Sequence, residues 1–371
     1  MSDDLDYEVL VAYTRTGQVV DGIDQPDWSF EENLAWASPG KLSLTVPLPG
    51  LDRAGQILRS TLRGIASAGC GVSLVLMRGD DALWAGPVAT LEWTDTSVSV
   101  GCSTIGKLLD RRVVVADGYW ADPTNPAADL TVALPPRDLV IELLTRAISG
   151  SRRDLPIVLP AQSGNSGDPV TYKGVDLRTT FEAVKAVVEA DGGPDVLMQP
   201  QMSADKSQLS WGAAIGTPDL GGLNSDAVWD YPLTTLSGDV DDSETVSTAY
   251  VTGDAAGGAS TARPIGVATF DRGDPWPALE RADRTSTSET RKSQLDALAA
   301  SYGEEYRWPV EAVTLGAPTD LLPLYRTTWQ LGDTGTFPFT GHPWLDDGEI
   351  SARIVGVSVD PDTTSFTTKE S

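Results

Sequence analysis

The run Leu42-Ser43-Leu44-Thr45-Val46 alternates strictly between apolar and polar residues and stops at Pro47. Because successive side chains of a strand point to opposite faces, this alternation predicts a strand with one buried face. Residues 72–76 and 98–100 repeat the pattern, and residues 7–13 form an apolar, β-branched run. Many short strands separated by turn signals favour a β-barrel or a β-sandwich.

Two other stretches complete the first hundred residues. Residues 82–93 are interrupted by Gly86-Pro87, which predicts a bent strand at a sheet edge, because proline donates no hydrogen bond to a neighbour. Residues 56–65 predict a helix, with four apolar residues on one helical stripe. These are Ile57, Leu58, Leu62 and Ile65.

The middle of the chain changes to helical spacing. A short helix is expected after Ser103 or Thr104, and residues 137–149 predict a longer one that Gly150 ends. Thr179 and Glu182 have the spacing of a capping box, which predicts another helix directly after Thr179.

The remaining segments alternate between loops, strands and one helix. Residues 216–244 are rich in Gly, Asp and Ser and predict a long loop. Residues 287–302 predict a helix that begins with the capping-box pair Ser286 and Glu289 and ends at Gly303. Further strands are expected at 196–198, 208–211, 246–252, 310–315, 325–331, 350–359 and 365–368.

Charge is the unusual feature of the composition. The 371 residues include 53 Asp and Glu against 27 Lys and Arg, a formal net charge of −26. A protein that wraps nucleic acid needs a basic face to displace counterions, so this class is disfavoured. The acidity fits solubility alone, a halophilic origin, or a surface that lets DNA pass without sticking.

The sequence shows neither the pattern of a membrane-spanning helix nor that of a secretory signal peptide. No apolar run approaches the roughly 18 residues that a membrane-spanning helix needs. The start, Met1-Ser2-Asp3-Asp4-Leu5-Asp6, is acidic where a secretory signal is basic and then apolar. We therefore expect a soluble protein without a Sec signal or a membrane-spanning segment.

Residues that could support catalysis or bind a metal are sparse. His342 is the single histidine and lies in a turn-like context without a nucleophile motif, so we expect a loop histidine with one hydrogen bond. Cys70 and Cys102 are too few for a disulfide framework or a zinc site, and we expect both to be buried and reduced. Residues 101–107 lack the spacing of a phosphate-binding loop and predict an ordinary strand-to-helix turn.

Acidic pairs and tryptophans leave alternatives open. A carboxylate pair could cleave a glycosidic bond, but with 53 acids the pairs Glu304-Glu305, Asp346-Asp347 and Asp241-Asp242 are expected by chance on the surface. Residues 239–244 resemble an acidic calcium loop without its residue order. The 11 Trp could stack on sugars if exposed, but core positions are favoured. No catalytic, cofactor-binding or metal-binding residue is predicted, and no cofactor.

The order of these elements resembles the baseplate-hub minor tail proteins of long-tailed siphophages, the tail-associated-lysin type of hub. The resemblance covers nearly the whole chain but depends on diffuse motifs. They are Trp28-Ser29-Phe30, residues 40–47, residues 98–112, residues 176–193, residues 246–253, Pro277-Ala278-Leu279-Glu280 and Leu331-Gly332-Asp333.

This resemblance implies a mainly β fold with inserted α/β segments and two related β-barrel modules of tail-hub type. It divides the chain into an N-terminal barrel module (1–115), an inserted α/β segment with two helices (116–200), a β segment that completes the first module (201–260) and a helix with the second barrel module (261–371). Three copies would then give six barrels around a tail tube.

The function implied is that of a structural tail-tip hub of the virion, assembled in the host cytoplasm as a homotrimer that lets DNA pass. Implied partners are a distal tail protein or tube ring, the tape measure protein, and other minor tail or receptor-binding proteins. DNA would pass through the lumen without specific binding. We expect no enzymatic activity, because the chain shows no lytic module after its last strand. The alternatives are a receptor- or glycan-binding tip protein and a β-rich glycoside hydrolase.

Overall fold

The computed structural model describes residues 7–24, 26–48, 53–150, 152–190, 192–223, 227–229, 235–253, 263–270, 273, 276–284, 292–307 and 310–370. These residues form two compact units. Unit 1 comprises residues 1–236 and 315–371, and unit 2 comprises residues 237–314. The boundary that we predicted at residue 260 therefore falls inside unit 2, and the four-segment division stays a prediction.

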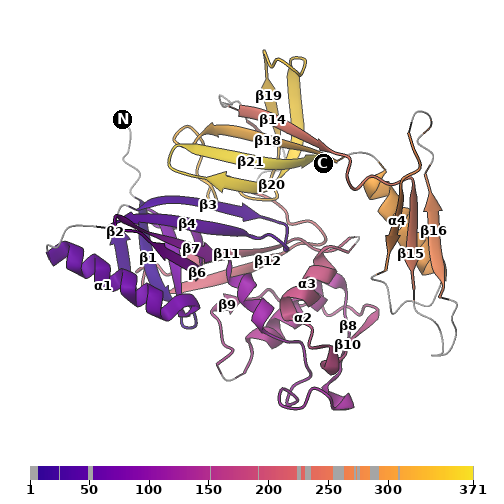
Figure 1. The fold of residues 1–371 in the computed structure, drawn as a ribbon, viewed down its shortest axis with the longest axis horizontal. Helices are drawn as coiled ribbons and strands as arrows, with labels where there is room; N and C mark the ends of the chain where they lie inside the picture. Colours follow the sequence, from indigo (N-terminus) through magenta and orange to yellow (C-terminus); the bar gives the residue numbers. More distant parts are fainter. Residues whose placement is uncertain are drawn as a thin grey trace. The chain divides into compact units, whose positions relative to one another are not determined.

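A large mixed sheet dominates unit 1 (Figure 1). Its strands run in the order β14-β18-β21-β20-β3-β4-β7-β6-β5-β1-β2, with β19 paired to β20 and to β13. Among the described residues this path stays open between β14 and β2. The prediction of a mainly β fold is confirmed. The pairing of the described strands does not show two closed barrels, so the two barrel modules stay a prediction.

The N-terminal half of this sheet follows the alternation in the sequence. In β4, Leu42, Leu44 and Val46 are buried and the residues between them are exposed, as predicted. The strands of this half are β1 (Tyr7–Tyr13), β2 (Val19–Asp24), β3 (Asp27–Asn33), β4 (Gly40–Pro47), β5 (Val72–Arg78), β6 (Asp81–Trp93) and β7 (Ser97–Ser103).

Strand β6 is an interior strand, so its predicted edge position is wrong. Residues before the bend pair with β5, and residues after it pair with β7, with an irregular register between Val88 and Thr90. Pro87 is tolerated because the strand changes neighbours at this point. A Cβ on Gly86 would lie 2.0 Å from the carbonyl oxygen of Ser103, so only glycine fits the bend.

Glycine-to-alanine substitutions should therefore have opposite effects at two positions. We expect Gly86→Ala to lower the free energy of unfolding by about 2–3 kcal/mol through overpacking. Gly64 lies inside a helix, and a Cβ added there would have nothing within 4 Å, so Gly64→Ala should raise it by about 1 kcal/mol. Urea midpoints at constant m-value measure both, and equal effects would refute the packing argument.

Helix α1 (Arg53–Ala68) confirms the helix predicted at 56–65 and extends it at both ends. It lies beside β2, where Thr61 donates a hydrogen bond to the Asp21 carboxylate. Leu62 and Ile65 are buried as the stripe predicts, but Ile57 is 60% exposed. The stripe predicts which side of the helix is apolar, but not how much of that side the sheet covers. Here the sheet covers only the part of it that carries Leu62 and Ile65.

The inserted segment contains both predicted helices, whose buried apolar side chains join residues of β1, β5 and β6 in one core. In α3, the Thr179 hydroxyl accepts from the Glu182 N–H and the Glu182 carboxylate accepts from the Thr179 N–H, so the predicted capping box is confirmed. The helix expected after Thr104 is the 3-10 helix η2, with no side-chain cap from Thr104. The elements are η1 (Gly69–Gly71), η2 (Ile105–Arg111), η3 (Pro126–Ala128), β8 (Leu130–Ala133), α2 (Pro136–Ile148), β9 (Ile157–Val158), β10 (Pro169–Tyr172), η4 (Gly174–Asp176), α3 (Thr180–Val188), β11 (Val196–Met202) and β12 (Leu209–Ile215).

The C-terminal half of the sheet corrects two predictions. Part of the expected loop at 216–244 forms β13 and β14. The sequence pattern did not indicate these strands, because their partners β19 and β18 lie much later in the chain. The strand expected at 325–331 is a turn in which Arg326 has a φ of 67°. The strands here are β13 (Ala227–Val228), β14 (Thr235–Asp241), β18 (Val310–Pro318), β19 (Thr334–Phe339), β20 (Gly348–Val359) and β21 (Thr363–Glu370).

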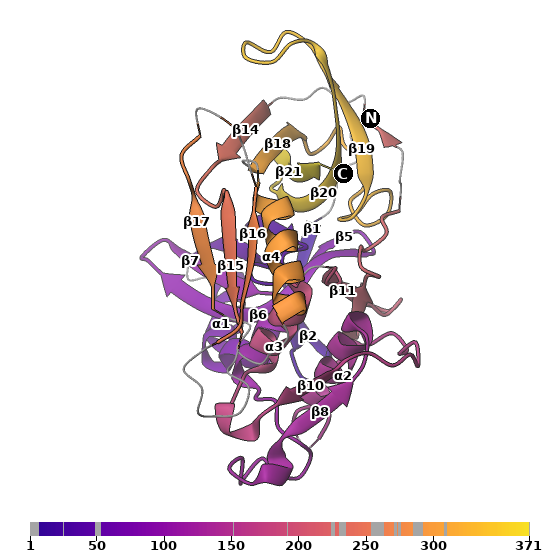
Figure 2. The same ribbon diagram turned by 90° about the vertical axis from the view of Figure 1, so that its right-hand side faces the viewer.

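Unit 2 packs one helix on a small sheet. Its core joins Ala249 and Val251 of β15 to Leu295 and Ala299 of α4 (Figure 2). The helix continues past Gly303, so the end that we predicted there is wrong. Gly303 serves packing instead, because a side chain at this position would collide with the ring of Phe270. The predicted cap pair Ser286 and Glu289 lies outside the described residues. The elements are β15 (Thr248–Thr252), β16 (Ile265–Thr269), β17 (Glu280–Asp283) and α4 (Lys292–Tyr306).

Candidate functional site

His342 lies in the loop between β19 and β20, and its ring nitrogens bond only to backbone. Nδ1 accepts hydrogen bonds from the N–H groups of Trp344 (3.3 Å) and Leu345 (3.1 Å). Nε2, 3.2 Å from the carbonyl oxygen of Leu236, therefore carries the proton and donates it there. The prediction of a loop histidine is confirmed, with more bonds than expected, and these contacts give it an organising role in the loop.

The two cysteines differ in environment, so the expectation that both are buried is wrong for one. Cys70 is exposed on η1, and Cys102 is 2% exposed on β7. Burial raises the pKa of Cys102 to about 12, although a backbone hydrogen bond with Leu74 acts against this. Both thiols are free.

The acidic candidates do not gather into a metal site. Within the described ranges, no group of three or more His, Cys, Asp or Glu side chains could hold an ion. The side chains of Asp239 and Asp241 in the calcium-like loop, and of the Glu304-Glu305 pair, lie outside the described residues. Glu244 pairs with Arg281. Asp346 and Asp347 are exposed beside His342, as predicted for surface acids.

Most described tryptophans fill the core, as predicted. Six are at most 5% exposed, namely Trp28, Trp36, Trp84, Trp211, Trp229 and Trp329. Four are exposed on four separate segments: Trp93 at the end of β6, Trp120 after η2, Trp276 in unit 2 and Trp344 after β19. Trp308 lies outside the described residues.

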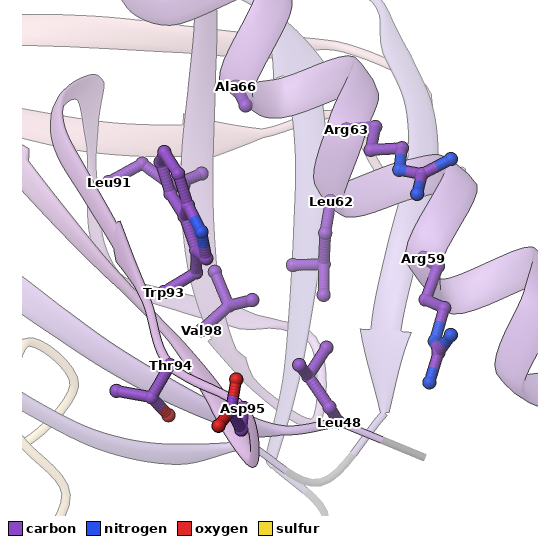
Figure 3. A pocket seen from close by; sticks show the side chains of 10 residues that line it. All are labelled: Leu48, Arg59, Leu62, Arg63, Ala66, Leu91, Trp93, Thr94, Asp95 and Val98. Carbon is purple, nitrogen blue, oxygen red and sulfur yellow. The ribbon is translucent and has the colours of Figure 1, made fainter. Parts of the chain in front are cut away.

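One exposed tryptophan borders a pocket of about 520 Å³ between α1 and strands β6 and β7 (Figure 3). We call it the α1 pocket. Its apolar wall consists of Leu48, Leu62, Ala66, Leu91, Trp93 and Val98, and its polar lining of Arg59, Arg63, Thr94 and Asp95. The two arginines come from α1 and lie opposite the indole of Trp93.

The α1 pocket suits binding better than hydrolysis. Glycoside cleavage needs two carboxyl groups across the bond, and Asp95 is the one carboxylate among the residues that line this pocket. An apolar wall with a few charged groups at the rim is typical of a site that binds an apolar group.

A buried ionic cluster joins β3 to the turn at 325–326. Glu32 accepts hydrogen bonds from the hydroxyl of Tyr325 and from Nη2 of Arg326 at 2.5 Å, and Arg326 Nε donates to the carbonyl oxygen of Leu83 at 2.8 Å. Burial raises the pKa of Glu32, although the charge of Arg326 and both hydrogen bonds act against it. This cluster holds the two halves of the large sheet together.

A second ion pair joins β20 to the inserted segment. Arg353 Nη2 lies 2.5 Å from Asp195 Oδ2 and donates to the carbonyl oxygen of Leu220 at 2.9 Å. Gly332 and Asp333, from the predicted family motif, form the turn before β19. Gly332 has a φ of 95°, and the buried Asp333 accepts from the Gln330 N–H.

Asp138 in α2 gives a prediction for acid stability. Burial alone would raise its pKa, but hydrogen bonds from the Ser163 hydroxyl and N–H, together with Arg137, hold it below the usual value. Because the folded-state pKa is depressed, this stabilisation is present above the unfolded pKa near 3.8 and is lost as the pH falls through the folded value. Asp138→Asn should lower the free energy of unfolding by about 1–3 kcal/mol at pH 7. Urea unfolding at pH 7 and pH 3 measures it, and a deficit that does not shrink in acid would contradict the assignment.

Sequence comparison places the chain in no known family. No protein-family model matches it, and no curated protein sequence matches it significantly. None of the described helices has the length and hydrophobicity of a transmembrane segment.

Comparison of folds gives a clear result. The chain is similar to the 43 kDa tail protein of prophage MuSo2 from Shewanella oneidensis, with 10% identity, 98% of each chain covered and a TM-score of 0.59. It is similar to a tail protein from Neisseria meningitidis, with 12% identity, 98% and 97% coverage and a TM-score of 0.57. A prophage tail protein from Listeria monocytogenes matches with 11% identity, 98% and 94% coverage and a TM-score of 0.50. The resemblance to phage tail proteins predicted from the sequence is thus confirmed at the level of the fold, which this chain shares with them over nearly its whole length.

Proposed function

We propose that this protein is a structural component of a phage tail tip, a baseplate hub of a long-tailed phage. The observation that carries the proposal is the nearly complete, two-way coverage of tail-protein structures. The aligned 98% of this chain includes both halves of the large sheet and the inserted segment, so the similarity to tail proteins is not limited to one part of the fold. Distal tail or tube proteins, a tape measure protein and other minor tail or receptor-binding proteins are the expected neighbours.

The proposed assembly is a homotrimeric ring in which each chain contributes two barrel-like modules. The two halves of the large sheet, joined where β20 pairs with β3, are the candidates for these modules. Light scattering behind a sizing column tests the assembly. A trimer has three times the chain mass of 39.3 kDa, or about 118 kDa, and electron microscopy should show a central hole. A monomeric mass together with an absence of rings on tails would refute this proposal.

The proposed ring surrounds a lumen through which DNA passes without specific binding. The net charge of −26 supports this, since an acidic wall repels the phosphate backbone. A structure of the assembled ring tests it. Acids concentrated on the outer wall, around a basic bore, would contradict the proposal.

We propose no lytic activity for this chain. The α1 pocket has one carboxylate in its lining, and His342 is engaged with backbone groups. Purified protein incubated with host peptidoglycan is expected to release no soluble fragments, and fragment release would refute the proposal. A glycan-binding tip remains the second candidate. Four described tryptophans are exposed, which favours such a role, and they belong to four separate segments of the chain.

A further inference from the structure

The loop between β19 and β20, residues 340–347, presents apolar side chains to solvent. Trp344 is 88% exposed and Leu345 is 37% exposed, and the exposed acids Asp346 and Asp347 follow directly. Figures 1 and 2 show the β19–β20 hairpin extending beyond the neighbouring strands of its sheet. Tryptophan is highly buried on average and is enriched among the residues that dominate binding energy. We call residues 340–347 the Trp344 loop.

This loop is held in shape before any partner binds. His342 fixes the N–H groups of Trp344 and Leu345 and is itself bonded to the carbonyl oxygen of Leu236. Asp347 Oδ1 accepts from the Gly341 N–H at 2.6 Å, and Gly341 has a φ of 71°, which glycine adopts without strain. A prearranged loop loses little conformational entropy on binding, so its exposed indole is suited to insertion into a partner.

The α1 pocket complements this loop in shape and charge. Its volume of about 520 Å³ is in the range of about 300–1,000 Å³ seen for sites that enclose small ligands, which is enough for an indole. Its wall is apolar, and Arg63 is exposed at the rim on a chain with a net charge of −26. The loop places two carboxylates directly after its apolar pair, so an arginine at the rim has a partner of opposite charge.

We propose that Trp344 of one copy docks into the α1 pocket of a second copy, with Asp346 and Asp347 facing Arg63. The inference rests on the proposed trimer and names one of its contacts. The occupant is a second copy because the chain carries both complementary surfaces. One is a loop with an exposed indole followed by two acids, and the other is an apolar pocket whose lining has two arginines against one aspartate, Asp95. The two surfaces differ, so the contact is heterologous, and in the proposed trimer three such contacts complete the ring.

Site-specific cross-linking tests the contact. In a Cys70→Ser background, Pro343→Cys marks the loop without removing Trp344, and Ala66→Cys marks the pocket. Cys102 stays, because it is buried with a pKa of about 12 and reacts poorly. The two chains carry different tags, are coexpressed and are treated with a short bismaleimide. We expect a product with both tags. Val175→Cys, exposed on η4, replaces Ala66→Cys as the matched control and should give none.

Association strength gives an independent measure. Trp344→Ala should weaken association at least about 30-fold per contact, equal to about 2 kcal/mol, and leave the circular dichroism spectrum unchanged. Arg63→Glu should also weaken association. Adding Asp346→Lys to the Arg63→Glu chain should restore part of it, because one pair of charges is then exchanged across the same contact. Asp347 is kept, because its carboxylate accepts the hydrogen bond from the Gly341 N–H that shapes the loop.

The outcomes separate this inference from the proposed function. A mass near 118 kDa without a mixed cross-link, and unchanged by Trp344→Ala, overturns the docking and leaves the proposed ring intact. A mixed cross-link with association that stops at two chains supports the docking and contradicts the trimer. Unchanged mass together with loss of binding to host cell-wall glycan in Trp344→Ala assigns the loop to an external ligand and overturns the docking.

Discussion

Arg326→Met is expected to lower the free energy of unfolding by about 3–5 kcal/mol, because it leaves the Glu32 carboxylate buried without a counter-charge. The side chains of Arg326 and Glu32 are 10% and 3% exposed, and Met keeps the apolar part of the arginine stem. Without Arg326 the pKa of Glu32 rises further. The deficit relative to the native protein should therefore shrink as the pH falls from 7 toward the ordinary glutamate value of 4.5, because the buried carboxyl of the variant takes up its proton above that pH.

The neighbouring residue on β3 offers the matched control. Glu31 pairs with Lys41 at 3.2 Å, but their side chains are 45% and 62% exposed. Solvent screens such a pair, so Lys41→Met should change the free energy of unfolding by less than about 1 kcal/mol. Urea unfolding of both variants at pH 7 and pH 5 measures the contrast. Equal losses, or a loss in Arg326→Met that is independent of pH, would mean that the cluster does not stabilise the sheet as we describe.

Trp329→Ala is expected to lower the free energy of unfolding by a similar amount, about 3–5 kcal/mol, because it opens a cavity in the C-terminal core. The indole is 2% exposed and contacts the rings of Tyr325 at 4.6 Å, Phe366 at 5.0 Å and Trp229 at 5.4 Å between centroids. Its Nε1 donates to the carbonyl oxygen of Pro323 at 2.9 Å, which the substitution leaves without this partner.

Trp120 provides a comparison of the same residue type near the surface. It is 39% exposed and stacks with Arg153, whose Cζ lies 4.0 Å from the ring centroid. Trp120→Ala should lower the free energy of unfolding by about 1 kcal/mol, the usual size of an exposed cation–π contact. Guanidinium unfolding followed by circular dichroism compares the two, and a Trp329→Ala loss below that of Trp120→Ala would contradict the core assignment.

Local patterns predicted the elements whose causes are local. The alternation of 42–46 gives one buried face whatever the neighbours are, and the capping box at Thr179 and Glu182 is complete within four residues. The order of elements along the chain also indicated the tail-protein fold, which the comparison of structures confirmed. The strand alternation and the capping box require no knowledge of distant parts of the chain, whereas the resemblance used the order of elements over nearly its whole length.

Features that depend on distant residues could not be predicted. The edge position assigned to residues 82–93 was wrong because the strand's second neighbour is decided by the whole sheet. The partner of Glu32 lies 294 positions away, and the turn at 325–326 is held by that contact. Likewise the α1 pocket collects side chains from a helix and two strands, so neither Trp93 nor Arg63 stood out before the fold was known.

The pairing of β20 with β3 delays completion of the large sheet during synthesis, because the two strands lie near opposite ends of the chain. Residues 30–33 align with residues 356–359, so one half of the large sheet has a free edge until nearly the whole chain has been made. At about 5–20 residues per second, the ribosome needs roughly 15 to 65 seconds to bridge that separation. During this interval β3 is an edge strand, paired only with β4, and its open edge is a hazard for aggregation. Newly made chains should therefore depend on chaperones, and a chain truncated before β20 should accumulate in inclusion bodies.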